Sequence, residues 1–239
     1  MTGATVFAFA TVFFAAAAQC GIFSVSPVRI HMTPRDRAVA VTVVNEGTES
    51  VALQADLNVW TQKADGTDEL KLSDDLILSP PIIRLAPKAR QVVRLALLVP
   101  ANPGRQLSYR LIMREIPEAT LRASGTVHVP VSLALSMPVF ITPPKAARDV
   151  SCTSERDARD TMSVAVTCTN GGTAYAQIRE VSVMRNDAVE AAFEGGVYIL
   201  PGAKKTIAVK SEKLLAAGPV QLRVGYDDIR HQLFEARLP

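Results

Sequence analysis

The segment from Thr126 to Phe140, TVHVPVSLALSMPVF, constrains the fold more than any other part of the chain. Its odd-numbered positions are all apolar, whereas its even-numbered positions are mostly polar, small or proline. Because side chains alternate between the two faces of a β-strand, this pattern predicts one long strand with one apolar face. Such a strand extends roughly 50 Å, well beyond the usual length of strands in globular proteins.

The two prolines of this segment, Pro130 and Pro138, are an even number of positions apart, so both lack an N–H donor on the same edge of the strand. Proline occurs in sheets mainly on edge strands or at bulges. We therefore predict an edge strand, which would pair with another chain or associate with itself if it were left exposed. The alternative is a core strand whose apolar face is buried in its own domain.

The chain begins with a nearly continuous apolar stretch over residues 1–20 that ends in small residues. This stretch is too short for a comfortable transmembrane helix, and it has the apolar core typical of a secretory signal peptide. No Lys or Arg precedes Arg29, so the positive start of a usual signal peptide is missing. We expect an exported protein.

Short alternating segments and turn residues fill the rest of the chain, without a convincing amphipathic helix. This pattern predicts an all-β fold with a β-sandwich of immunoglobulin-like size at residues 21–142 and a second, smaller β-domain at residues 149–239, joined by a Pro-Pro linker at 143–148. The expected strands are a first one at residues 23–32 interrupted by Pro27, then Ala38–Asn45, Val51–Trp60, Ile77–Leu85, Gln91–Val99, Leu107–Ile116, and after the linker Met162–Thr169, Ala176–Met184, Val197–Leu200, Thr206–Lys210, Val220–Tyr226 and Gln232–Leu238.

Two cysteines, Cys152 and Cys168, flank a polar segment and a strand-like segment in the second half. A hairpin would bring them within bridging distance, and an oxidising compartment would favour a disulfide. The alternative is a pair of buried thiols.

The sequence contains no recognisable catalytic, metal or nucleic-acid motif. His31, His128 and His231 are far apart, and the chain has no GxSxG, CxxC or glycine-rich phosphate loop. Its net charge of +3 comes from dispersed Lys and Arg, without a basic stripe carrying aromatic residues. We predict a protein that is not an enzyme and uses no cofactor, metal, nucleic acid or small-molecule substrate; an enzyme would need a site assembled from distant loops.

Several segments together resemble the periplasmic pilus-assembly chaperones of the chaperone–usher pathway, and most of all their archaic branch. The matching segments are SPVRI (Ser26–Ile30), VTVVNEG (Val41–Gly47), LSPPIIRLAPKARQVVRL (Leu78–Leu95), YRLIMREIPE (Tyr109–Glu118) and VHVPVSLALSMPVF (Val127–Phe140).

This resemblance implies a periplasmic chaperone whose two immunoglobulin-like β-sandwich domains are set at an angle and whose long strand is lent to an incomplete pilus subunit. The subunit is then handed to an outer-membrane usher. Strand addition of this kind combines main-chain hydrogen bonds with side-chain pockets. The donor side chains implied are Val127, Val129, Val131, Leu133 and Leu135.

The resemblance also implies basic residues that hold the C-terminal carboxylate of the subunit, and Arg29 matches the first of them. Pro138 occupies the position of the usual second basic residue, a lysine, so Arg94 and Arg110 become its substitute candidates. Glu115 matches a residue of an interdomain salt bridge, for which Asp227 is the candidate partner. A surface arginine without a ligand remains the alternative for Arg29.

A second functional class is a structural pilus subunit or surface adhesin built from β-sandwiches. A subunit would carry a donor segment of alternating residues before its first strand. Only Gly21–Ser24 separates the predicted signal peptide from the first strand, which favours the chaperone.

Overall fold

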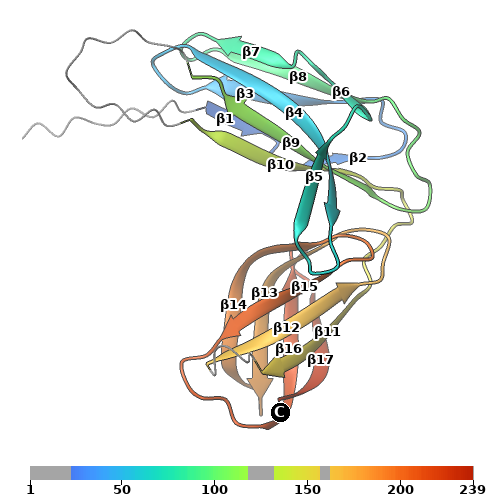
Figure 1. Ribbon diagram of the computed structural model, residues 1–239, viewed down its shortest axis with the longest axis vertical. Coiled ribbons are helices and arrows are strands. Elements are labelled where there is room, and N and C mark those ends of the chain that lie inside the picture. Colours follow the sequence, from blue (N-terminus) through green and yellow to red (C-terminus); the bar gives the residue numbers. More distant parts are fainter. Residues whose placement is uncertain (1–22, 118–131, 157–161, 239) are drawn as a thin grey trace, which may run out of the picture.

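The computed structural model describes residues 23–117, 132–156 and 162–238, and every regular element in these ranges is a β-strand. Figure 1 shows two groups of strands, β1–β10 above and β11–β17 below, whose strands run in different directions. The prediction of an all-β fold with two sandwich domains at an angle is therefore confirmed.

The first domain is a sandwich of two sheets. The four-stranded sheet has the order β1 (Phe23–Ser26), β3 (Ala38–Asn45), β8 (Arg90–Leu97), β6 (Leu76–Ser79). The other sheet has the order β2 (Ile30–Met32), β10 (Ala134–Ile141), β9 (Leu107–Glu115), β4 (Val51–Gln62), β5 (Asp68–Leu72), and β7 (Ile82–Leu85) pairs with β4. The chain thus changes sheet at Pro27, where the sequence shows only an interrupted strand.

The core of this domain follows from the alternation of each strand. Val41 and Val43 of β3 and Val93 of β8 are fully buried on the inner face of one sheet. Leu53 of β4 and Leu111 of β9 are fully buried on the inner face of the other. Apolar side chains at every second position therefore fill the space between the sheets, as in other aligned sandwiches.

The strand β10 lies at the edge of its sheet over most of its length. It pairs with β9 throughout, but with β2 only at Val139–Ile141. Among the described residues, positions 134–138 have no strand on the other side, which confirms the predicted edge for this part. The predicted continuation from Thr126 to Val131 lies outside the described residues.

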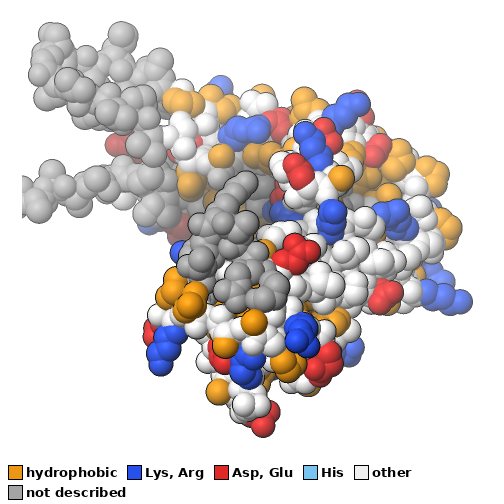
Figure 2. Space-filling view, turned by 60° about the horizontal axis from the view of Figure 1, so that its bottom comes forward, with side chains coloured by type: hydrophobic (Ala, Val, Ile, Leu, Met, Phe, Trp, Pro, Cys, Tyr) orange, Lys and Arg blue, Asp and Glu red, His pale blue; other side chains and the backbone are white. Residues whose placement is uncertain are grey.

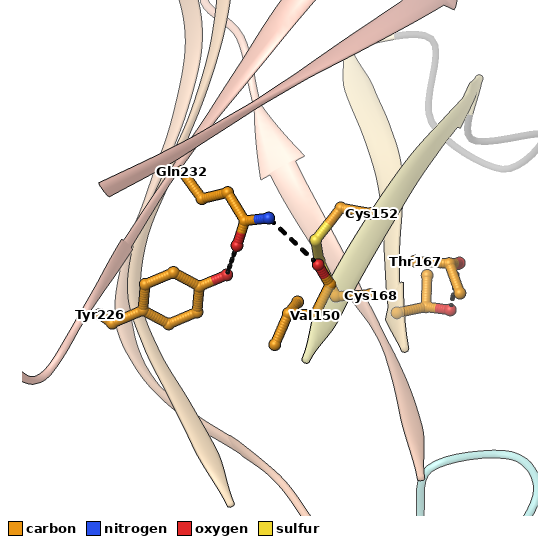
Figure 3. Close-up of a disulfide and its surroundings, with 7 residues drawn as sticks. Val150, Cys152, Thr167, Cys168, Tyr226 and Gln232 are labelled. Carbon is orange, nitrogen blue, oxygen red and sulfur yellow. Dashed lines mark hydrogen bonds between the residues drawn. A yellow bond between two sulfur atoms is a disulfide. The ribbon is translucent and has the colours of Figure 1, made fainter. Parts of the chain in front are cut away.

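The second domain consists of one sheet that folds over into two layers. Its order is β11 (Val150–Arg156), β12 (Ser163–Asn170), β15 (Lys204–Lys210), β14 (Ala188–Ile199), β13 (Ala176–Arg185), β16 (Gly218–Tyr226), β17 (His231–Leu238). Only Ala192 and Lys210 pair β14 with β15. Gln232 of β17 donates a hydrogen bond of 3.4 Å to the carbonyl of Val150 in β11, and so links the two ends of the sheet (Figure 3).

The predicted disulfide is present between Cys152 and Cys168 (Figure 3). The two cysteines lie directly opposite each other in the antiparallel pair β11–β12, and both are buried. The sequence suggested a polar loop after Cys152, but β11 continues to Arg156 because its backbone pairs with β12. Main-chain pairing therefore decides the structure of a segment whose composition favours a loop.

Replacing both cysteines by serine should lower the free energy of unfolding by about 3 kcal/mol, because the bridge restricts the unfolded chain over a loop of this length. Urea unfolding of the oxidised protein, the reduced protein and the double variant measures this effect. The reduced protein and the variant should agree with each other. Equal unfolding midpoints for all three samples would contradict the stabilising role.

The surface carries mixed charge, and Figure 2 shows Lys and Arg side chains interspersed with Asp, Glu and apolar groups on the visible face. Among the residues that the structure describes, no group of His, Cys, Asp and Glu is arranged to hold a metal ion. In the same ranges no helix is long and apolar enough to cross a membrane.

Candidate functional site

Aromatic side chains fill the junction between the two domains. Trp60 of β4 and Phe140 of β10 point out of the first sandwich and form a buried cluster with Leu200 of the second domain. Phe140 stacks on Tyr175 with ring centroids 4.0 Å apart, and Trp60 meets Tyr198 edge-on at 5.3 Å. Such contacts stabilise beyond the area that they bury, so the junction holds the two domains in a defined arrangement.

Arg29 lies directly before β2 and reaches into the second domain. Its guanidinium contacts Asp227 at 2.5 Å, the side-chain oxygen of Gln177, and the hydroxyl of Tyr175 at 3.3 Å. These bonds use Nη1 and Nη2, while Nε makes no hydrogen bond to a described residue. Burial, and next the charge of Asp227, raise the pKa of Tyr175 to about 12, so this hydroxyl remains protonated at neutral pH.

The predicted interdomain salt bridge between Glu115 and Asp227 is wrong, because both side chains are carboxylates and neither supplies the cation that a salt bridge needs. Glu115 also lies at the end of β9 far from the second domain. The junction is at the other end of that strand, where Gln106 donates its backbone N–H to Thr173 of the second domain. Glu115 instead accepts a hydrogen bond of 3.3 Å from the backbone N–H of Leu133. Asp227 does link the domains, but its partner is Arg29.

Arg110 lies on β9 directly opposite Pro138 of β10. Its guanidinium carbon is 3.8 Å from the ring centroid of Trp60 and 5.5 Å from that of Tyr198. It forms no salt bridge with any carboxylate of the described residues. Burial lowers its pKa, which is the expected effect on a cation held in a poorly solvated place.

The structure brings Arg29 and Arg110 together but leaves Arg94 elsewhere. The guanidinium carbon of Arg29 is 5.7 Å from the Tyr198 ring, the same ring that Arg110 approaches. The pairing of β2 with β10 starts at Ile30, which lies opposite Val139, so Arg29, one residue earlier, lies next to Pro138. Arg110 of β9 lies on the other side of Pro138. Arg94 is exposed on β8 of the four-stranded sheet, away from Arg29 and Arg110.

The predicted donor residues are only partly described. Val127, Val129 and Val131 lie outside the described residues. Leu133 and Leu135 are half-buried and pack against the core of their own domain. Met137, Val139 and Ile141, on the same face of β10, are buried in that core. Leu133 and Leu135 therefore lie at its rim.

The hairpin formed by β4 and β5 is a second contact between the domains that sequence analysis missed. Figure 1 shows it extending from the first domain down to the second. The side chain of Gln62 donates to the carbonyl of Tyr198 and accepts from the N–H of Leu200, both at 2.9 Å. Asp68 pairs with Lys205 at 3.1 Å. Asp65 and Gly66 are typical turn residues, but nothing in the sequence of this hairpin indicates what it contacts.

A pocket of about 590 Å³ lies beside Arg29, on the surface of the second domain. It extends from Arg29 and Asp227 to the turn between β16 and β17, and Arg179 and His231 also line it. A separate pocket of about 430 Å³ borders Arg110. Each of the two arginines therefore borders an open pocket in which a ligand could bind.

Comparison with solved structures shows the same two-domain fold at low sequence identity. A chain of the archaic CsuC–CsuE chaperone–tip adhesion protein pre-assembly complex of Acinetobacter baumannii is 17% identical, with a TM-score of 0.67 and coverage of 91% of this chain and 99% of that one. The E. coli chaperone DraB is also 17% identical, with a TM-score of 0.59 and coverage of 92% and 97%.

A third similar structure is the Salmonella enterica complex of the SafA pilin with the SafB chaperone, at 14% identity, a TM-score of 0.60 and coverage of 92% and 97%. No curated protein matches the chain. The family model described as pili and flagellar-assembly chaperone, PapD N-terminal domain, matches residues 22–147, which is more than half of the chain. The chain therefore belongs to the family of PapD-like pilus-assembly chaperones.

Proposed function

We propose that this protein is a periplasmic chaperone that completes an unfinished pilus subunit with its own edge strand and passes the subunit to an outer-membrane usher. The observation that carries the proposal is the free edge of β10, where residues 134–138 pair with β9 on one side and with no strand of the described ranges on the other. The alternating sequence continues toward Thr126 with the same period, so the donor surface would extend over Val127, Val129, Val131, Leu133 and Leu135.

Membership of an assembly-chaperone family supports this role over catalysis and over the alternative of a structural subunit. Two of the similar solved structures are complexes of such a chaperone with a subunit. A disulfide between Cys152 and Cys168 fits the oxidising periplasm, as does the apolar segment at residues 1–20.

The C-terminal carboxylate of the subunit would bind between the domains, at Arg29 and Arg110. Arg110 supports this assignment because its guanidinium is half-buried and forms no salt bridge with a described carboxylate, although Asp68 lines the same pocket, so a ligand carboxylate would be its direct charged partner. The Nε of Arg29 makes no hydrogen bond to a described residue, and the planar guanidinium suits bidentate recognition of a carboxylate. Pro138, which is buried and lies opposite Arg110, adds no charge beside the two arginines.

The test is affinity purification of the tagged protein from the periplasm of its native host, followed by mass spectrometry of the bound chains. We expect a pilus subunit in equimolar complex, and loss of that subunit by proteolysis when the chaperone gene is deleted. Recovery of this chain within assembled fibres would favour the alternative of a structural subunit. Unchanged amounts of the subunit after deletion would contradict the chaperone role.

A further inference from the structure

The turn between β16 and β17 holds an exposed isoleucine in an unfavourable backbone conformation. Ile229 has a φ of 60° and is 90% exposed. Positive φ is tolerated by Asn and Asp, which occupy such positions in this chain at Asn186 and Asp187. For a β-branched residue it costs on the order of 1–3 kcal/mol, and burial of the side chain does not offset this cost here.

Charged and polar contacts impose this conformation on the turn. Arg148 donates two hydrogen bonds to the carboxylate of Asp228, at 2.9 and 3.1 Å. The N–H of Ile229 donates to the carbonyl of Tyr226 at 3.2 Å. On the other side, Asp227 is held by Arg29. The turn is therefore tied to both domains, and it presents the isoleucine side chain in a fixed direction.

Ile229 lines the pocket of about 590 Å³ that also borders Arg29. The other described residues of its lining are charged, polar, aromatic or glycine, so Ile229 provides its one aliphatic side chain. The two carboxylates of the lining already have partners, since Asp227 bonds to Arg29 and Glu180 to His231. An apolar group beside the cations Arg29 and Arg179 then suits a chain end, which has a carboxylate and a nearby side chain.

We infer that this pocket takes the last residues of the bound subunit, and that Ile229 packs against an apolar side chain close to the carboxylate held by Arg29. The inference rests on the proposed function. It gives the second domain a contact that selects among the chain ends of different subunits. A subunit with a polar or small side chain near its C-terminal carboxylate would leave Ile229 exposed in the complex.

Ile229→Asn separates this role from a structural one, because asparagine tolerates positive φ. The variant should have a Tm about 2–4 °C above wild type, since the strain is relieved. It should also bind a peptide ligand roughly 5–10-fold more weakly, since an apolar contact is lost. The matched control is Leu214→Asn, an exposed residue in the loop at the opposite end of β16, 67% exposed, where peptide affinity should not change.

The probe is a short synthetic peptide with a free C-terminal carboxylate and a leucine near that end, titrated to millimolar concentration into the labelled full chain. NMR follows the Arg29 Nε–H signal and the Ile229 methyl signal. We expect the peptide to shift both signals, its C-terminal amide to shift neither, and its Leu→Ala version to shift Arg29 alone with reduced affinity.

The outcomes distinguish the two proposals. A shift at Arg29 without one at Ile229, or unchanged affinity in Ile229→Asn, would overturn the pocket assignment and leave the carboxylate anchor standing. No shift at Arg29 with the free peptide would overturn the anchor, and with it the inference that depends on it.

Discussion

Replacement of Arg29 by alanine is expected to reduce the capture of pilus subunits by roughly 100-fold or more while both sandwiches remain folded. The expectation rests on the desolvated position of this guanidinium at the junction, where a partner carboxylate would lose its charged donor. Pull-down of a subunit and the rate of its proteolysis measure the effect. Circular dichroism checks that the β-structure is retained.

Arg29 also serves the fold, because Asp227 would lose its partner in the variant. The side chain of Asp227 is only 18% exposed, so we expect a stability loss of about 1–3 kcal/mol. From the sequence, Arg29 is expected to hold a ligand carboxylate or, in the alternative, to lie on the surface without a ligand, whereas the structure adds this interdomain cost.

Two control variants separate binding from domain orientation. Arg114→Ala removes an ion-paired arginine of the same sheet, where Arg114 contacts Asp56, and capture should be unchanged. Asp227→Asn removes the internal ion pair but keeps the charge of Arg29, so capture should persist. If Asp227→Asn fails as completely as Arg29→Ala, then Arg29 acts by orienting the domains. If Arg29→Ala captures subunits normally, then Arg110 is the next candidate.

Leu133→Glu is expected to abolish protection of subunits and to leave a cooperative unfolding transition. A carboxylate in an apolar groove of the partner costs far more than most interfaces can offset. Within this chain the substitution is cheaper, because Leu133 is half-buried at the rim of the core and a longer side chain there can reach solvent. We expect a loss of about 1–2 kcal/mol in unfolding free energy.

The matched control for this variant is Ser132→Glu, an exposed neighbour of opposite parity. A donor strand distinguishes its two faces, so the control should still protect subunits from aggregation and proteolysis. Equal loss of protection in both variants would contradict the proposed register. Unfolding of the first domain by Leu133→Glu would instead assign this face to the core of the protein itself.

Local sequence patterns determined most strands of this protein. The segments Ala38–Asn45 and Leu107–Ile116 follow the period of two that a half-buried strand requires, and β3 and β9 occupy them. The same pattern misses most of β14, where Ala, Glu and Gly replace the β-branched residues expected of a strand. Pairing with β13 along almost its full length forms this strand despite its composition.

The charged residues of the candidate site could not be paired from the sequence. Arg29 and Asp227 lie almost 200 residues apart in the chain, and Glu115 has a charge as suitable as that of Asp227. Only the register of β9 decides that Glu115 points to the far end of the first domain. For the same reason the sequence offered Arg94 and Arg110 as equals, although their strands belong to different sheets.

The sequence by itself determined the fold class, the edge character of the last strand of the first domain and the cysteine pairing, because each depends on side-chain period, proline or short-range spacing. The tertiary structure alone decided the change of sheet at Pro27, the meeting of Arg29 with Arg110 and the strained exposure of Ile229. These features depend on which strands become neighbours across long stretches of chain. That choice is made by the summed packing of two sandwiches and their junction, and no local pattern records it.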